Sequence, residues 1–174
     1  MTFVAIDFET ATSQPYSACA VGIISVQDSV ITDEFECLIQ PPKNLYFQQN
    51  TKVHGLSAND TKHALAFDNV FVEIQQRLIG KQVVAHNESF DRNVLKQCIA
   101  HYQLSSKGLL LHRNWNCTVK LSQHLGYSPN KLSDCCQRFN IPLQHHDALS
   151  DARACAILFM QLSAQQRKNK MYLF

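Results

Sequence analysis

The segment Phe3–Glu9 constrains the fold more than any other part of this chain, because an apolar run ends there in two carboxylates. A continuous apolar run of this length is typical of a β-strand covered on both faces. Side chains alternate along a strand, so Asp7 and Glu9 share one face, with Cα atoms about 6.6 Å apart at about 3.3 Å per residue. Both carboxylates can therefore reach the same bound cation.

Two helical patterns also begin with an acid on their apolar face. Asp91 precedes Val94 and Leu95 by three and four positions, which places it on the inward side of a helix. Asp151 stands in the same relation to Cys155. The helix dipole, at about 0.3–1 kcal/mol, is enough to explain either acid taken alone. It does not explain why a buried strand ends in two further acids.

The remaining hydrophobic patterns predict an α/β fold, with a mixed five-stranded sheet flanked by helices. The first strand should lie near the centre and be followed by a hairpin that turns at Asp28-Ser29. The expected later strands are 19–27, 30–39, 81–85 and 115–117, and the expected helices are 67–78, 88–102, 119–125, 132–139 and 148–165. In this arrangement the four acids converge at the carboxyl end of the first strand.

The composition fits one globular domain, 1–174, with a core over 3–163 and a short tail over 164–174. No window approaches eighteen uninterrupted apolar residues, so no membrane partner is expected. The seven cysteines lack a C-x-x-C spacing and are predicted to be reduced, buried thiols of a cytoplasmic protein. A net charge of +2 argues against a protein that coats long duplexes but is compatible with a short or single-stranded nucleic acid.

The gathered carboxylates favour a metal-dependent reaction. Like charges in a partly desolvated cleft raise one another's pKa, and divalent cations remove that conflict. Oxygen ligands favour Mg²⁺ or Mn²⁺, and two such ions about 3.5–4 Å apart can support hydrolysis of a phosphodiester. His146, five positions before Asp151, is a candidate general base. A zinc site at Cys135, Cys136 and the neighbouring histidines is disfavoured, because adjacent cysteines rarely supply two tetrahedral ligands.

Three segments together resemble the DEDDh family of exonucleases, which includes the proofreading subunit of DNA polymerase III, exonuclease X and ribonuclease T. They are Asp7–Thr10, Ala85–Asp91 and His146–Ala152, and the resemblance extends over residues 3–163. Each motif is weak alone, but the three occur in the family's order. The chain departs from the commonest pattern at Asp147, whose negative charge would weaken the approach of a phosphate.

The resemblance implies a ribonuclease H-like fold and removal of nucleotides from a 3′ end as nucleoside 5′-monophosphates. Asp7, Glu9 and Asp151 would then hold two Mg²⁺ or Mn²⁺ ions, with Asp7 bridging them. Asp91 would contribute to the second ion through water. His146 would be the base.

The resemblance also implies a pocket for the terminal nucleotide. Phe8 and Phe90 would line it by apolar or stacking contacts, and Thr10, His54 and Asn87 by polar contacts. Asn87 has the alternative of being a helix cap, and His54 that of belonging to a turn.

We therefore expect a 3′–5′ exonuclease that acts on single-stranded or frayed ends, with DNA favoured as substrate. The alternatives are an exoribonuclease that trims RNA 3′ ends or short RNAs, and a non-catalytic module that binds nucleic-acid ends or a polymerase. The expected partner is a DNA or RNA 3′ end, and a polymerase or a second copy of the chain are further candidates.

Overall fold

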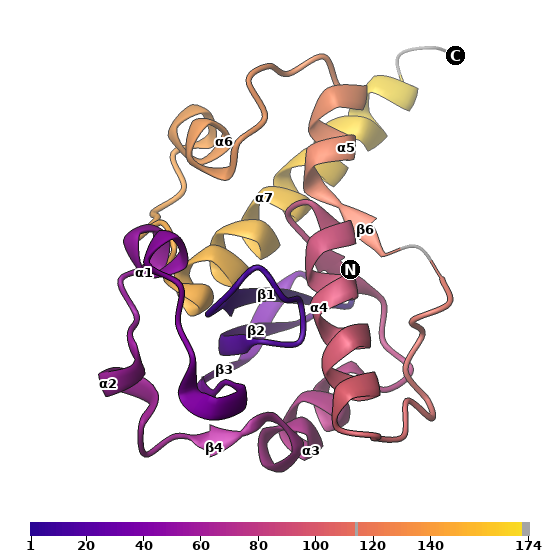
Figure 1. Ribbon diagram of the computed structural model, residues 1–174. Coiled ribbons are helices and arrows are strands. Elements are labelled where there is room, and N and C mark those ends of the chain that lie inside the picture. Colours follow the sequence, from indigo (N-terminus) through magenta and orange to yellow (C-terminus); the bar gives the residue numbers. More distant parts are fainter. Residues whose placement is uncertain (114, 172–174) are drawn as a thin grey trace.

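A six-stranded mixed β-sheet forms the centre of the computed structural model (Figure 1), which describes residues 1–113 and 115–171, with side chains through residue 169. The strands are β1 (Phe3–Thr10), β2 (Ala18–Gln27), β3 (Val30–Gln40), β4 (Leu65–Ala66), β5 (Val83–Ala85) and β6 (Asn116–Cys117). Their order in the sheet is β4-β3-β2-β1-β5-β6. β1 pairs antiparallel with β2 and parallel with β5, so the first strand lies near the centre, as predicted.

Helices cover both faces of this sheet, which confirms the predicted α/β fold (Figure 1). They are η1 (Pro42–Asn44), α1 (Gln48–His54), α2 (Ala58–Thr61), α3 (Phe67–Leu78), α4 (Glu88–His101), α5 (Thr118–His124), α6 (Leu132–Phe139) and α7 (Ala148–Met171). The core on one face contains residues of α3 and α4, and the core on the other contains residues of α7.

Side chains of β1 alternate between these two cores. The even-numbered residues of Val4–Phe8 pack with α3 and α4, whereas Phe3 and Ala5 pack with α7. Asp7 and Glu9 belong to the odd-numbered set and therefore point to the α7 face. The alternation thus directs both carboxylates of β1 towards the helix that carries another acid in its first turn.

The structure holds more than the predicted elements: η1, α1 and α2 lie between β3 and β4 where no helix was predicted, and two further differences concern β4 and α7. β4 adds a sixth strand, parallel to the end of β3, and its two residues are too few to give a periodic signal. α7 continues past the predicted end at residue 165 to Met171, so the predicted tail is mostly helical, and residues 172–174 lie outside the described part. Arg167 and Lys168 favour this extension because cations are stabilising near a helix C-terminus.

Asn87 stands at the N-cap position of α4, but its side chain makes no capping hydrogen bond. Its backbone is left-handed, with φ 67° and ψ 58°, a conformation that asparagine tolerates better than most residues. Its Oδ1 accepts a hydrogen bond from Ser89 Oγ at 3.1 Å. Asn87 is therefore the N-cap residue of α4, as predicted, but its side chain does not cap the helix, because the chain turns into α4 through a left-handed residue.

The cysteines are all free, and six of the seven are buried, which confirms the prediction of buried thiols. Among the described residues, no helix combines the length and the hydropathy needed to cross a membrane.

Gly22 on β2 lets α7 begin directly against the sheet. It lies opposite Asp7 in the ladder between β1 and β2. A Cβ at position 22 would overlap the carbonyl oxygen of Ala148 and lie 2.5 Å from the amide nitrogen of Leu149. The backbone of the first turn of α7 thus occupies the space that a side chain would fill, and this close approach brings Asp151 near Asp7.

Gly22→Ala should destabilise the protein by more than about 3 kcal/mol, the upper end of ordinary overpacking, because backbone atoms of α7 would have to move. Urea unfolding measures this loss. Gly126→Ala is the control: an added Cβ there meets nothing within 4 Å, so only its left-handed backbone (φ 81°) should cost about 1–2 kcal/mol. Equal losses in the two variants would contradict the close approach.

Candidate active site

Three carboxylates meet at the carboxyl end of β1. Asp7, Glu9 and Asp151 each offer an oxygen, and these atoms all lie within 4.8 Å of one another. The first two come from β1 and the third from the first turn of α7. The structure thus brings together three of the four acids that the sequence singled out.

Asp91 reaches the same region from the opposite face of the sheet. It lies in the first turn of α4, is 1% exposed, and its Oδ1 accepts a hydrogen bond from the backbone N–H of Phe8 at 3.0 Å. It does not belong to the set within 4.8 Å, but its charge raises the pKa of Asp7. Asp91 therefore lies beside the cluster and is held by the backbone of β1.

The cluster retains protons at neutral pH when no cation is present. Burial, followed by the charges of Asp91, Glu9 and Asp151, raises the pKa of Asp7 well above its ordinary value. Burial and the charge of Asp151 raise the pKa of Glu9 to about 8. Burial also raises the pKa of Asp151, against the opposing effect of the backbone N–H of His146. These carboxylates are thus destabilised as anions unless positive charge joins them.

The donor set fits a divalent cation. Asp151 Oδ1 is buried and has no hydrogen-bond partner among the described residues. An unsatisfied buried carboxylate oxygen is costly, and a bound cation would satisfy it. Because the three clustered ligands are carboxylates, the set suits hard ions such as Mg²⁺ or Mn²⁺.

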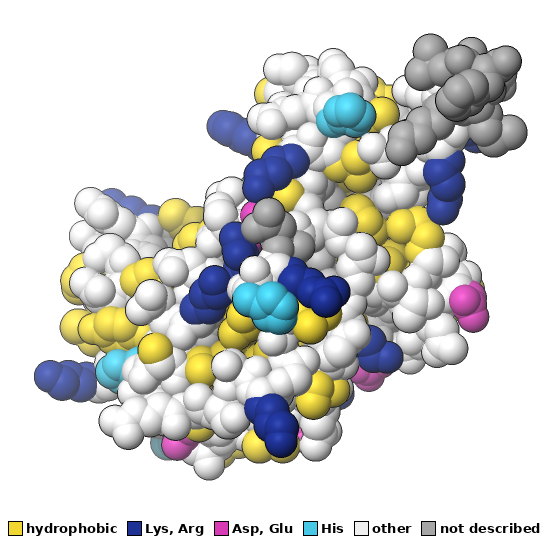
Figure 2. Space-filling model, turned by 90° about the vertical axis from the view of Figure 1, so that its right-hand side faces the viewer, with side chains coloured by type: hydrophobic (Ala, Val, Ile, Leu, Met, Phe, Trp, Pro, Cys, Tyr) yellow, Lys and Arg dark blue, Asp and Glu magenta, His cyan; other side chains and the backbone are white. Residues whose placement is uncertain are grey.

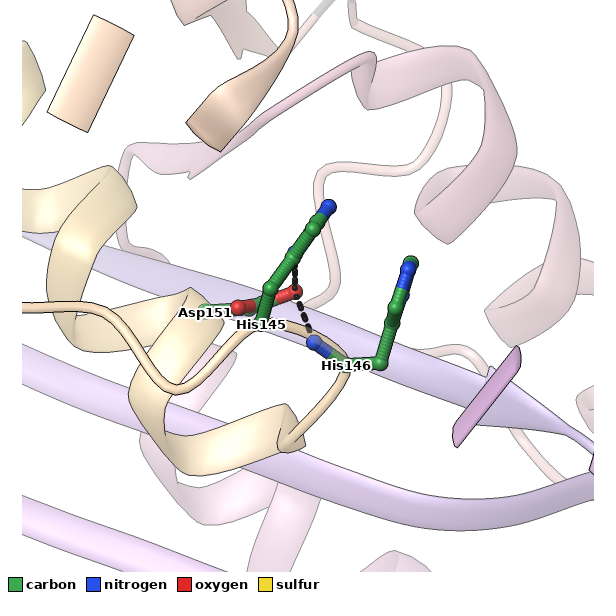
Figure 3. A group of neighbouring side chains, drawn as sticks. All are labelled: His145, His146 and Asp151. Atoms are coloured by element: carbon green, nitrogen blue, oxygen red, sulfur yellow. Dashed lines mark hydrogen bonds and ion pairs between the residues drawn. The ribbon is translucent and has the colours of Figure 1, made fainter. Parts of the chain in front are cut away.

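Two histidines stand on the loop before α7 (Figure 3). The ring of His145 contacts the carboxylate, with Nδ1 3.0 Å from Asp151 Oδ2. His146 donates its backbone N–H to the same oxygen at 3.1 Å, and its ring stacks on that of His145 at 3.8 Å. One ring nitrogen of each histidine and one carboxylate oxygen of Asp151 all lie within 4.8 Å of one another. Burial and the neighbouring His145 lower the pKa of His146, so its imidazole is largely neutral at neutral pH and can accept a proton.

Asp147 caps the helix that carries Asp151. Its Oδ1 accepts a hydrogen bond from the backbone N–H of Ser150 at 2.8 Å, the usual N-cap geometry. Its charge also raises the pKa of Glu9, after burial and Asp151. The unusual acid in the third motif therefore has a structural role at the start of α7.

A cavity of about 660 Å³ opens over the carboxylates. Among the predicted residues it is lined by Asp7, Phe8, Glu9, Asn87, Phe90, His146 and Asp151. Phe90 is 45% exposed and presents an apolar surface, whereas Phe8 is almost fully buried. Asp91 does not line this cavity, and it is 1% exposed.

Thr10 and His54 line a neighbouring cavity of about 310 Å³, together with Glu9 and Phe90. His54 Nε2 lies 3.2 Å from the carbonyl oxygen of Thr10, and its Nδ1 accepts a hydrogen bond from the backbone N–H of Leu56. Nε2 of His54 thus links α1 to the end of β1, and Nδ1 is engaged by the backbone just after α1. These two residues lie next to the main cavity and not in it.

Sequence reasoning missed several residues of the main cavity. They come from loops and helix ends, and they are Val53, His86, Val119, Asn130, Lys131, Leu132 and His145. Among the described residues that line the cavity, Lys131 is the only lysine or arginine. His145 had one available signal, its position next to His146 and six residues before Asp151.

A protein-family comparison matches residues 4–159 to the RNase_T family, described as an exonuclease. The chain is 28% identical to a PolC-type DNA polymerase III of Thermotoga petrophila, over 96% of this chain and 12% of that protein. It is 28% identical to the 3′-5′ exonuclease DinG of Bacillus subtilis, over 95% of this chain and 18% of that protein. It is 22% identical to DNA polymerase III subunit epsilon of Buchnera aphidicola, over 97% of this chain and 74% of that protein. The chain thus spans about an eighth of the PolC-type relative.

Solved exonuclease structures share the fold. Exonuclease X in complex with 5′ overhanging duplex DNA superposes with a TM-score of 0.72 at 22% identity, over 93% of this chain and 91% of that one. Exonuclease I gives a TM-score of 0.81 at 16% identity, over 99% of this chain and 43% of that one. The nuclease domain of 3′hExo, a DEDDh family member bound to rAMP, gives 0.77 at 15% identity, over 94% and 92%. These matches confirm the ribonuclease H-like fold.

The raised pKa of Glu9 predicts that Glu9→Gln changes the stability of the metal-free protein by an amount that depends on pH. Between the ordinary value of 4.5 and about 8, folded Glu9 keeps a proton that the unfolded chain has released, so stability is lost as the pH rises through that window. Glutamine cannot ionise. The variant should therefore match the parent near pH 4.5 and become more stable than it at about pH 8.

Thermal unfolding in EDTA across this range measures the difference, and comparison with the parent cancels the titration of other groups. Mn²⁺ at the upper pH should stabilise the parent more than the variant, because a bound cation takes the place of the proton. A difference that does not vary with pH would contradict the buried position of the Glu9 carboxyl.

Proposed function

Because the chain belongs to the RNase T family of DEDDh-type 3′–5′ exonucleases, we propose that it removes nucleotides from single-stranded or frayed DNA 3′ ends and releases nucleoside 5′-monophosphates. The observation that carries this proposal is the meeting of Asp7, Glu9 and Asp151 within 4.8 Å under an open cavity. Enzymes of this family depend on divalent metal ions. The presence of all four acids and His146 argues against a non-catalytic module.

Asp7, Glu9 and Asp151 would hold Mg²⁺ or Mn²⁺, and Asp91 would add its negative charge to the site. When bound, the ions supply an activated water and stabilise the departing oxygen. Asp91 keeps the end of β1 in place through its hydrogen bond to the Phe8 amide.

His146 would accept the proton of the attacking water on a ring nitrogen. Its ring stacks on that of His145 beside Asp151, and a lowered pKa keeps the imidazole neutral and able to take a proton. The backbone of the same residue is fixed to Asp151 Oδ2, so base and carboxylate are held in a constant relation.

The terminal nucleotide would lie in the cavity between α1 and α4. The exposed face of Phe90 is available for contact with a base, and Val53 lies across the same cavity. Asn87, whose amide nitrogen is not used in a cap, would offer a donor to the sugar or the phosphate. Lys131 would attract the phosphate.

DNA is the favoured substrate because relatives over nearly the whole chain include a DNA polymerase III of PolC type and a DNA polymerase III subunit epsilon. The same similarity supports association of this chain with a DNA polymerase, since it matches only part of the PolC-type protein. Trimming of RNA 3′ ends is the competing activity to be tested.

The direct test is incubation of the purified protein with Mn²⁺ and matched deoxy and ribo oligonucleotides labelled at the 5′ end. We expect a ladder of products shortened from the 3′ end, with nucleoside 5′-monophosphates released and the deoxy strand degraded faster. A faster ribo strand would reassign the substrate to RNA. No monophosphate from either strand would refute the proposed function.

Asp7→Asn and Asp151→Asn should each abolish turnover, because each removes a charge that would hold a cation. Both should leave the metal-free protein at least as stable as the parent, since like-charge repulsion at a buried site is removed. Parallel nuclease assays and thermal melts measure the two effects. Asp28→Asn, in the exposed hairpin turn, is the control and should change neither.

His146→Ala should slow turnover by on the order of 10²-fold, the usual contribution of a general base, with little change in substrate affinity. Rates at saturating oligonucleotide measure the loss. The exposed His63 is the matched control, and His63→Ala should retain the parental rate. Parental turnover in His146→Ala would remove its role as the base.

A further inference from the structure

His145 has no role in the proposed reaction, although its side chain lines the main cavity and is 38% exposed. It forms a stack with His146, with ring centroids 3.8 Å apart, and no other two of the eight histidines, all of them described, stack on each other. Histidine side chains on the face drawn in Figure 2 stand apart from one another. The stack therefore places a second imidazole directly beside the candidate base.

The two histidines occupy the centre of a tight turn before α7. The Asp147 N–H donates to the carbonyl oxygen of Gln144 at 3.2 Å and closes the turn around them. His146 takes the third position of this turn with φ 68°, a left-handed backbone that residues with a Cβ adopt rarely. The Gln144 N–H donates to Ser150 Oγ at 2.7 Å and joins the start of the turn to α7. The backbone of the candidate base is thus held in an uncommon conformation by the first turn of α7.

The two carboxylate oxygens of Asp151 differ in their contacts. Oδ2 accepts the backbone N–H of His146 at 3.1 Å, and Nδ1 of His145 lies 3.0 Å from the same atom. An ionised carboxylate only accepts hydrogen bonds, so Nδ1 of His145 carries the hydrogen. Oδ1 has no hydrogen-bond partner among the described residues. Two N–H groups therefore hold one oxygen and leave the other for a cation.

The ring of His145 also limits the position of the His146 ring. The two rings lie nearly parallel, with an interplanar angle of 18° (Figure 3). The hydrogen bond from His146 to Asp151 uses the backbone, and among the described residues no hydrogen bond orients the ring itself. The stack is therefore the contact that restricts the direction of the base.

We propose that His145 is a positioning residue of the reaction, which acts through Asp151 and His146 and not on the substrate. Its Nδ1–H fixes the carboxylate so that Oδ1 remains for the cation, and its ring supports the ring of the base. Hydrogen-bond partners of metal-binding side chains commonly contribute about 10–100-fold to metal affinity. The inference rests on the proposed nuclease function and adds to it the residue that joins a metal ligand to the base.

Three substitutions separate the two contacts. His145→Asn keeps an N–H donor near the place of Nδ1 but removes the ring, His145→Phe keeps a ring but removes the donor, and His145→Ala removes both. His63→Asn, at an exposed position outside the cavity, is the matched control. Thermal melts in EDTA give a working temperature at which every variant is folded, so that a loss of fold is not mistaken for a loss of position.

The affinity for Mn²⁺ without nucleic acid measures the hydrogen bond, with the EPR signal of the free ion as the readout. His145→Phe and His145→Ala should bind about 10-fold more weakly than the parent, the lower end of the usual contribution, because the His146 N–H still holds Oδ2. His145→Asn should recover the parental affinity, and since it has no imidazole nitrogen, that recovery excludes direct ligation by His145. Equal affinities in His145→Asn and His145→Ala would overturn the proposal.

Turnover at saturating Mn²⁺ and oligonucleotide measures the ring contact. His145→Asn and His145→Ala should be about 10-fold slower than the parent with little change in KM, a part of the roughly 10²-fold that a general base contributes. His145→Phe should recover most of the parental rate. A merely structural role would lower affinity and turnover together in each variant. Equal rates in His145→Phe and His145→Ala would therefore contradict the proposal.

The two measurements also separate this proposal from the proposed function. If the parent cleaves oligonucleotides and His145→Ala equals it in both Mn²⁺ affinity and turnover, the nuclease function stands and only the role of His145 is lost. If the parent releases no monophosphate from any oligonucleotide, the nuclease function is refuted, and a positioning role in that reaction is refuted with it.

Discussion

The candidate active site depends on the alternation of side chains along β1. This strand is covered on both faces, so its even-numbered residues must pack with α3 and α4 and its odd-numbered residues with α7. Asp7 and Glu9 fall in the odd-numbered set and face the helix that carries Asp151. A shift of one residue in register would turn both carboxylates to the other face and replace them with apolar side chains.

The close approach of α7 to β2 is the second requirement. Gly22 leaves room for the backbone of Ala148, and Asp147 caps the helix at that point. The same contact that seats α7 thus fixes the third carboxylate and the loop with His145 and His146. The resulting cluster is electrostatically strained, because burial raises the pKa of Asp7 and Glu9. That strain is the physical reason to expect cation binding, since positive charge relieves it.

The sequence alone determined the long elements and the identity of the acids. Apolar periodicity identified β1, the hairpin, α3, α4 and α7, and the acids were visible because charge is unexpected on apolar faces. Short elements such as α1 and β4 escaped, since α1 buries no residue and β4 has only two. Tertiary structure decided what no local pattern encodes: that Asp91 binds the Phe8 amide from the opposite face, that His54 and Thr10 bind each other beside the main cavity, and that His145 contacts Asp151. The physical reason is that periodicity reports which face a residue occupies, whereas contacts between faces arise only when helices distant in the sequence pack on the sheet.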